Sequence, residues 1–169
     1  MEKMLAIVFV DEKTAYEGAR ALSDLNGEDS IAVNAVAVIK KNADGTVSTK
    51  RVDGDFPIKT FAGTAIGSLV GILGGPVGVA VGAGVGAYAG LIGDLYASGV
   101  DADFLSDASA ALIPGKCAVV ADVDEDWVTP VDVKMESLGG VVFRTLKTTV
   151  EDDHWSREAA AARTELDQL

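Results

Sequence analysis

The sequence predicts an α+β fold that is interrupted by a long uncharged insertion. Short runs of apolar and β-branched residues alternate with segments of helical periodicity over residues 1–56 and 100–148. Between Lys59 and Asp94 the chain has no charged residue, and eleven of its 19 glycines lie there. We therefore expect an α+β domain formed by residues 1–56 and 100–148, an inserted segment at 57–98 and a tail at 149–169.

The N-terminal half predicts a strand, a helix and a pair of strands. Met4 to Val10 is an apolar run that is typical of a buried strand. Asp11 or Thr14 then caps a helix that ends near residue 27, with an apolar stripe formed by Ala15, Ala19, Leu22 and Leu25. Residues 31–39 and 46–52 are rich in strand-forming side chains, and the turn residues between them predict a hairpin.

The C-terminal half continues the alternation of helix and strand. Asp101 caps a helix that carries Phe104, Leu105, Ala108 and Leu112 on one face, and residues 116–123 predict a strand. Thr129 and Pro130 open another helix as its cap and first position, and residues 141–146 predict the last strand. Without the insertion, the first six elements match the split βαβ order of a ferredoxin-like sheet.

The insertion carries two ladders of glycines that predict a glycine-zipper helical hairpin. We expect helices over about residues 57–73 and 76–97, because Gly74-Gly75-Pro76 interrupts the helical pattern. Residues four apart share one face of a helix, and a face of glycines lets a second helix approach closely. The predicted contact points for packing and assembly are Gly63, Gly67, Gly71, Gly78, Gly82, Gly86 and Gly90.

Such a hairpin exposes a large apolar surface that something must cover. Its helices would be about 26 and 33 Å long, against a hydrocarbon core of about 30 Å, so a membrane-spanning hairpin is one alternative. The high glycine content and the position of Tyr88 favour a second alternative, a soluble homo-oligomer with its hairpins packed together. Burial within the monomer is the third. In the first two alternatives, the apolar surface of the hairpin is buried by lipid or by other subunits rather than by the domain's own core.

Several motifs resemble those of a bacterial family, the domain of unknown function 1269, whose members are often described as predicted membrane proteins. The matching features are the strand Ala6-Ile7-Val8-Phe9, the glycine-rich hairpin from Thr60 to Gly93, and the short motifs at residues 99–104, 113–116 and 138–140. The resemblance covers about residues 4–146 and leaves out the acidic tail after Val150. It implies a similar fold, and it supplies no activity and no catalytic residues.

Two patterns outside the hairpin invite a chemical interpretation. Asp122, Asp124, Glu125 and Asp126 form an acidic cluster whose oxygens suit Ca²⁺ or Mg²⁺, but a solvated, helix-capping turn is the simpler interpretation. Residues 82–87 look like a GxGxxA dinucleotide loop, yet their glycines continue the ladder that begins at Gly78, which a strand and turn would not need.

The remaining reactive side chains are few. Cys117 lies in an apolar run typical of a buried thiol, and the only histidine, His154, lacks the neighbours of a zinc site or a catalytic triad. We therefore expect no catalytic residue, no metal and no cofactor. The net charge of −12 argues against binding to nucleic acid.

These observations favour a non-enzymatic structural protein that self-associates through its hairpin, either as a homo-oligomer or in a lipid bilayer. The tail residues Trp155, Leu166 and Leu169 form a stripe that we expect to dock on the domain or on a second subunit. The N-terminal apolar run is too short for a signal peptide, so we expect a cytoplasmic or cytoplasmic-membrane location and no secretion. The alternative is a small-molecule-binding or sensing module.

Overall fold

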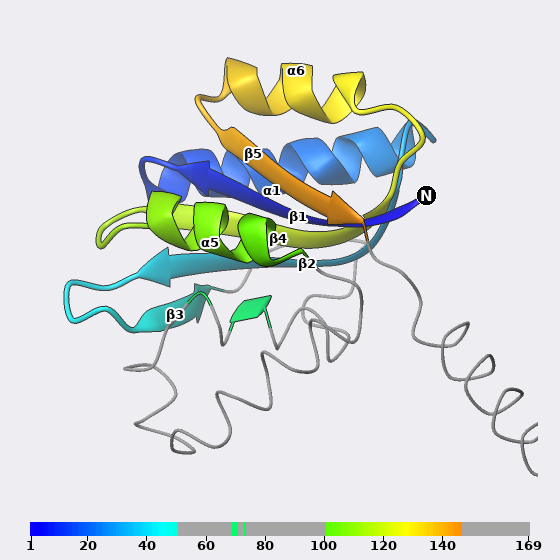
Figure 1. Ribbon diagram of the computed structural model, residues 1–169. Helices are drawn as coiled ribbons and strands as arrows, with labels where there is room; N and C mark the ends of the chain where they lie inside the picture. Colours follow the sequence, from blue (N-terminus) through cyan, green and yellow to red (C-terminus); the bar gives the residue numbers. More distant parts are fainter. Residues whose placement is uncertain (51–68, 71–72, 74–100, 147–169) are drawn as a thin grey trace, which may run out of the picture.

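A five-stranded antiparallel sheet forms the centre of the computed structural model, with helices on both of its faces (Figure 1). The structure describes residues 1–50, 69, 70, 73 and 101–146. In chain order the main elements are β1 (Glu2–Phe9), α1 (Glu12–Gly27), β2 (Ala32–Lys41), β3 (Val47–Lys50), α5 (Ala102–Ala111), β4 (Cys117–Asp124), α6 (Thr129–Ser137) and β5 (Val141–Leu146). The predicted α+β class is confirmed.

The strand order is β3-β2-β4-β1-β5, so β4 and β1 occupy the middle of the sheet. β4 pairs antiparallel with both β1 and β2, and β1 pairs antiparallel with both β4 and β5. Sequence reasoning took residues 46–52 as the third strand of the split βαβ order, which would place them in the middle. This assignment is wrong, because β4 occupies the place between β1 and β2 and leaves β3 beside β2 at the edge of the sheet.

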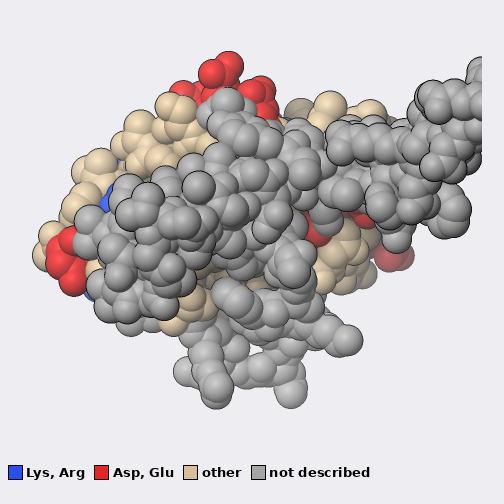
Figure 2. Space-filling model, turned by 60° about the horizontal axis from the view of Figure 1, so that its bottom comes forward, with Lys and Arg blue, Asp and Glu red and all other residues tan. Residues whose placement is uncertain are grey.

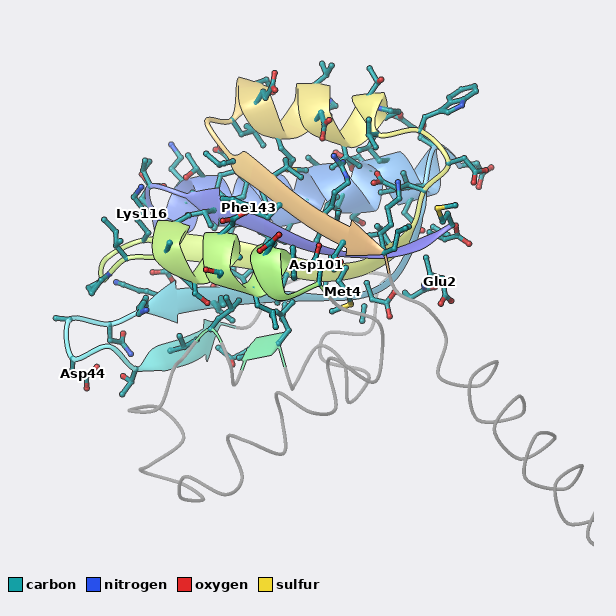
Figure 3. The ribbon with its side chains drawn as sticks, viewed as in Figure 1. Glu2, Met4, Asp44, Asp101, Lys116 and Phe143 are labelled. Atoms are coloured by element: carbon teal, nitrogen blue, oxygen red, sulfur yellow. The ribbon has the colours of Figure 1, made fainter. Side chains whose placement is uncertain are left out.

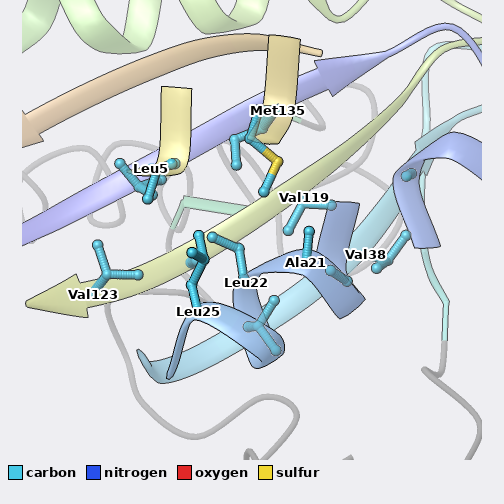
Figure 4. Close-up of a cluster of buried hydrophobic side chains, with 14 of the residues drawn as sticks. Leu5, Ala21, Leu22, Leu25, Val38, Val119, Val123 and Met135 are labelled. Atoms are coloured by element: carbon cyan, nitrogen blue, oxygen red, sulfur yellow. The ribbon is translucent and has the colours of Figure 1, made fainter. Parts of the chain in front are cut away.

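The two faces of the sheet carry separate hydrophobic cores, as the alternating side chains of β1 show. Leu5, Ile7 and Phe9 belong to a core under α1 and α6, which is drawn in Figure 4 with Leu22 and Met135. Met4, Ala6 and Val8 belong to a second core on the α5 side, and Figure 3 labels Met4 and Phe143 there. Both stripes predicted for the helices are buried: Ala15, Ala19, Leu22 and Leu25 on α1, and Phe104, Leu105, Ala108 and Leu112 on α5.

The helix starts agree with the sequence in two cases and differ in the third. Asp11 caps α1, because its Oδ1 accepts a hydrogen bond from the Thr14 backbone N–H at 2.8 Å. These Thr14 hydrogen bonds, from the backbone and the hydroxyl, lower the pKa of Asp11. Asp101 caps α5 in the same way, through Asp103 N–H at 3.1 Å.

The predicted cap of α6, Thr129, is wrong. Thr129 is already helical, and Val128 occupies the N-cap position without a side-chain hydrogen bond. Pro130 in the first turn has no N–H, so it removes one of the donors that a capping side chain would otherwise satisfy.

Two glycines make room for the ring of Phe9 in the core under α1 and α6. A Cβ built on Gly18 of α1 would lie 2.8 Å from Phe9 Cε2, and one built on Gly140 would lie 2.7 Å from Phe9 Cε1. Real Cβ atoms do not approach this closely, so a side chain at either position would force the buried Phe9 ring to shift.

Three residues of the inserted segment are described, and they are helical, as predicted for residues 57–73. Leu69 and Leu73 are 0% and 2% exposed and pack in the core on the α5 side. For these two residues the structure agrees with the third alternative, burial within the monomer. In the part of the chain that the structure describes, no helix is long and apolar enough to cross a bilayer.

Candidate functional site

A buried carboxylate, Glu125, lies directly after β4 and pairs with two cations. Its Oε1 accepts a hydrogen bond from Arg144 Nε at 2.8 Å and from Lys3 Nζ at 3.3 Å. The side chain of Glu125 is 0% exposed, that of Lys3 12% and that of Arg144 21%. These two ion pairs connect three parts of the sheet: Lys3 near the beginning of β1, Glu125 directly after β4, and Arg144 on β5.

The strand register places these groups on one face of the sheet. Lys3 lies two residues before Leu5, so both point towards α1 and α6. Arg144 is the register partner of Leu5 and therefore points to the same side. On α6, Asp132 Oδ1 lies 2.8 Å from Arg144 Nη2. We call Lys3, Glu125, Asp132 and Arg144 the ion cluster.

The charges of the ion cluster balance, with two carboxylates against two cations. Burial alone would lower the pKa of Arg144, but the neighbouring carboxylates of Asp132 and Glu125 outweigh it and raise that pKa. Arg144 is therefore a permanent cation that holds α6 against β5. The second oxygen of Glu125, Oε2, is buried and has no hydrogen-bond partner among the described residues.

A groove runs between α6 and the outer side of β5, next to the ion cluster. It has a volume of about 360 Å³ and is lined by Asp132, Glu136, Gly140, Val141, Val142 and Arg144. Val141, the first residue of β5, is 55% exposed. Because β5 ends the sheet, no described strand covers its outer edge. Among the described residues, the groove is therefore bounded by an unpaired strand edge on one side and by the carboxylates of α6 on the other.

The acidic residues 122–126 do not converge in the structure. Asp122 Oδ1 lies 3.4 Å from Asn34 Nδ2, whereas Asp124 and Asp126 contact the α-amino group of Met1. Among the described residues, no group of three or more acidic, histidine or cysteine side chains is placed to hold a metal ion. The interpretation as a solvated, helix-capping turn is wrong for Asp122 and Glu125, which are buried, and Val128 holds the N-cap position of α6 instead.

Sequence reasoning missed the ion cluster, although the pattern contains a signal for it. Lys3 is two residues from the core residue Leu5 on β1, and Arg144 is two residues from Val142, which packs against the same core, on β5. A cation at such a position points into the core side of the sheet and needs a partner there. Which carboxylate supplies that partner depends on pairing between distant strands, which the sequence alone does not reveal.

The other predicted site residues have separate outcomes. Cys117 is buried at the start of β4, as predicted. The predicted assembly glycines, Gly63, Gly67, Gly71, Gly78, Gly82, Gly86 and Gly90, lie outside the described residues, and so do the predicted docking residues Trp155, Leu166 and Leu169. His154 and the loop at 82–87 also lie outside them.

The described surface is acidic, in agreement with the net charge of −12. Figure 2 shows patches of Asp and Glu at several margins of one face and only small areas of Lys and Arg. In the groove the balance is also negative, because the ion cluster is neutral and Glu136 adds an exposed carboxylate.

A family model described as "Protein of unknown function (DUF1269)" matches residues 60–158. The match confirms the resemblance drawn from the sequence motifs, with a different extent. It begins after β3, and it includes residues 151–158 of the tail, which the motifs had left out. No curated protein and no solved structure matches the chain significantly.

Proposed function

Because this chain belongs to the DUF1269 family, for which no function is known, we propose its function from its own residues: a non-enzymatic structural protein that self-associates through the glycine ladders of residues 57–98. The proposed fold is a ferredoxin-like sheet that carries a glycine-zipper hairpin. The observation that carries the proposal is the position of Leu69 and Leu73 on the sheet.

Strand order supports the ferredoxin-like part of this proposal. β4 lies between β1 and β2, which α1 connects, and β1 lies between β4 and β5, which α6 connects. Two interlocked split βαβ units of this kind make up a ferredoxin-like sheet. On this interpretation β3 is an added edge strand, and α5 is an added cover for the second face.

The two leucines support self-association through the first ladder. Leu69 and Leu73 are four residues apart, and both are buried against the sheet. Gly67 and Gly71 each precede one of them by two residues, which corresponds to a rotation of about 200° on an α-helix. A helix that continued through all four positions would dock on the sheet by its leucines and present its glycines on the opposite side, where another helix can approach.

The experiment compares the mass of the full-length protein with that of its Gly67→Leu and Gly82→Leu variants by multi-angle light scattering. We expect each leucine to separate the packed helices and to shift the mass towards that of the monomer. Gly27→Leu is the matched control, because a Cβ on this residue at the end of α1 meets no atom within 4 Å. The proposal fails if wild type is monomeric, or if the ladder variants keep the wild-type mass.

A second measurement separates the two environments in which the ladders can pack. Cell fractionation without detergent places a bilayer-embedded hairpin in the membrane pellet, and a soluble assembly in the supernatant at high apparent mass. Light scattering is then carried out in detergent or in buffer accordingly. A protein found in the supernatant as a monomer contradicts both forms of the proposal.

A further inference from the structure

The outer edge of β5 has the composition of a strand that accepts a partner. Its sequence, Val-Val-Phe-Arg-Thr-Leu, is rich in strand-forming residues and contains no proline and no lysine. Val141 and Leu146, at its two ends, are 55% and 51% exposed. Every second residue of an edge strand turns its backbone N–H and C=O outwards, where an added strand can pair with them.

The single charged residue of β5, Arg144, has its ion-pair partners within its own sheet and on α6. Exposed edge strands are commonly protected by charged side chains that keep other strands away. Arg144 is instead engaged on its own sheet, because its Nε lies 2.8 Å from Glu125 Oε1 and its Nη2 lies 2.8 Å from Asp132 Oδ1. The ion cluster thus withdraws the guanidinium from the position in which it would repel an incoming strand.

The charge of the groove indicates what kind of strand would fit. Lys3, Arg144, Glu125 and Asp132 neutralise one another, which leaves Glu136 as the lining residue without an ion pair among the described residues. Alternate side chains of an added strand point to the α6 side of the sheet, where Glu136 lies. A basic side chain on that strand would therefore find a carboxylate.

We propose that the groove between α6 and β5 binds an extended, basic segment of a partner protein, which adds to the sheet as a strand beside β5. Backbone hydrogen bonds to β5 supply the affinity, and a Lys or Arg side chain at Glu136 selects the segment. This proposal is independent of self-association through the glycine ladders, because it uses only residues of α6 and β5.

A second copy of this chain fits the edge less well than a basic partner. Pairing of two β5 strands would bring the α6 helices of both copies together. The carboxylates of Asp132 and Glu136 in one copy would then face the same two carboxylates in the other copy and repel them. The two arginines of such a dimer are already bound to Glu125 and Asp132 within their own copies. The charge of the groove therefore favours a basic partner over a second copy.

The test is a titration of the isotope-labelled full-length protein, in detergent if the wild type requires it, followed by the amide signals of its NMR spectrum. The probe is a short, end-capped peptide in which valine and lysine alternate. We expect shifts concentrated in residues 141–146 and in α6. Glu136→Gln should weaken binding about two- to fivefold, as expected for one exposed ion pair, whereas the matched control Glu17→Gln on α1 should leave it unchanged.

Two further probes separate strand addition from attraction to an acidic surface. The same peptide with N-methylated backbone amides keeps its charge but cannot pair with β5, so we expect it to lose binding. A valine–glutamate peptide should also fail to bind. The proposal is overturned if the methylated peptide binds as well as the parent, if the shifts lie outside α6 and β5, or if Glu136→Gln behaves like Glu17→Gln. It is also overturned if β5 signals shift with protein concentration alone, which would assign the edge to a second copy.

Discussion

At the scale of single residues, the ion cluster is the feature with the largest electrostatic consequence. Glu125 has no exposed side-chain surface, and its two cations come from strands near opposite ends of the described chain. A buried ion pair contributes little net stability when it is complete, because desolvation offsets the attraction between the charges. Removing one partner is costly, because the remaining charges stay buried without compensation.

Glu125→Gln should therefore destabilise the protein strongly. We expect the free energy of unfolding to fall by about 3 kcal/mol, because Lys3 and Arg144 lose the carboxylate between them. Urea denaturation at neutral pH measures this change. Glu17→Gln on the exposed side of α1 is the matched control and should change the value by less than about 0.5 kcal/mol. A loss at Glu125 no larger than that at Glu17 would show that the pair is not buried in solution.

At the scale of elements, the sequence predicted local structure well and capping less well. The predicted range of β5, residues 141–146, agrees with the structure, because a run of strand-forming residues follows directly after Gly139-Gly140. Gly139 has a φ of +78°, a conformation that favours glycine and ends α6. The cap of α6 was predicted wrongly. The Thr129-Pro130 pair has the pattern of an N-cap followed by the first helical residue, but the helix begins one residue earlier, with Val128 at the N-cap.

The packing around Phe9 gives a test of how tightly the elements fit. Gly18→Ala and Gly140→Ala should each lower the free energy of unfolding by about 1–3 kcal/mol, because the new methyl group meets the Phe9 ring. Gly27→Ala, at an open position of the same helix as Gly18, should be neutral or slightly stabilising. Urea denaturation of the three variants measures the difference.

A second substitution on Phe9 shows whether the ring is responsible. In the Gly18→Ala background, Phe9→Leu should cost less than it does in wild type, because the smaller side chain relieves the contact. Strictly additive losses of Gly18→Ala and Phe9→Leu would mean that the ring and the helix do not touch as described.

At the scale of the whole molecule, strand order was the part that the sequence could not reveal. β4 pairs with β1 across more than a hundred residues, as in the pair of Glu2 and Asp124. No local pattern encodes which of several apolar strands takes the middle of a sheet, so β3 was placed there wrongly. The same distance explains why Glu125 was not recognised as the partner of Lys3.

The second face of the sheet depends in part on residues from the insertion. Leu73→Ala should lower the free energy of unfolding by about 2–5 kcal/mol, because it leaves a cavity in the core on the α5 side. Ile113→Ala, at a residue that is 51% exposed, is the control and should have a small effect. Equal and small losses, measured by urea denaturation, would mean that the insertion does not contribute to this core.

The central position of β1 has a consequence for synthesis on the ribosome. β1 emerges first, yet its pairing partners are β4 and β5, which lie within residues 117–146. Until those residues emerge, the buried run from Met4 to Phe9 has neither neighbouring strand and exposes its apolar side chains to water or to a chaperone. Completion of the sheet therefore waits until residues 117–146 have emerged, and its many long-range pairings favour slow folding.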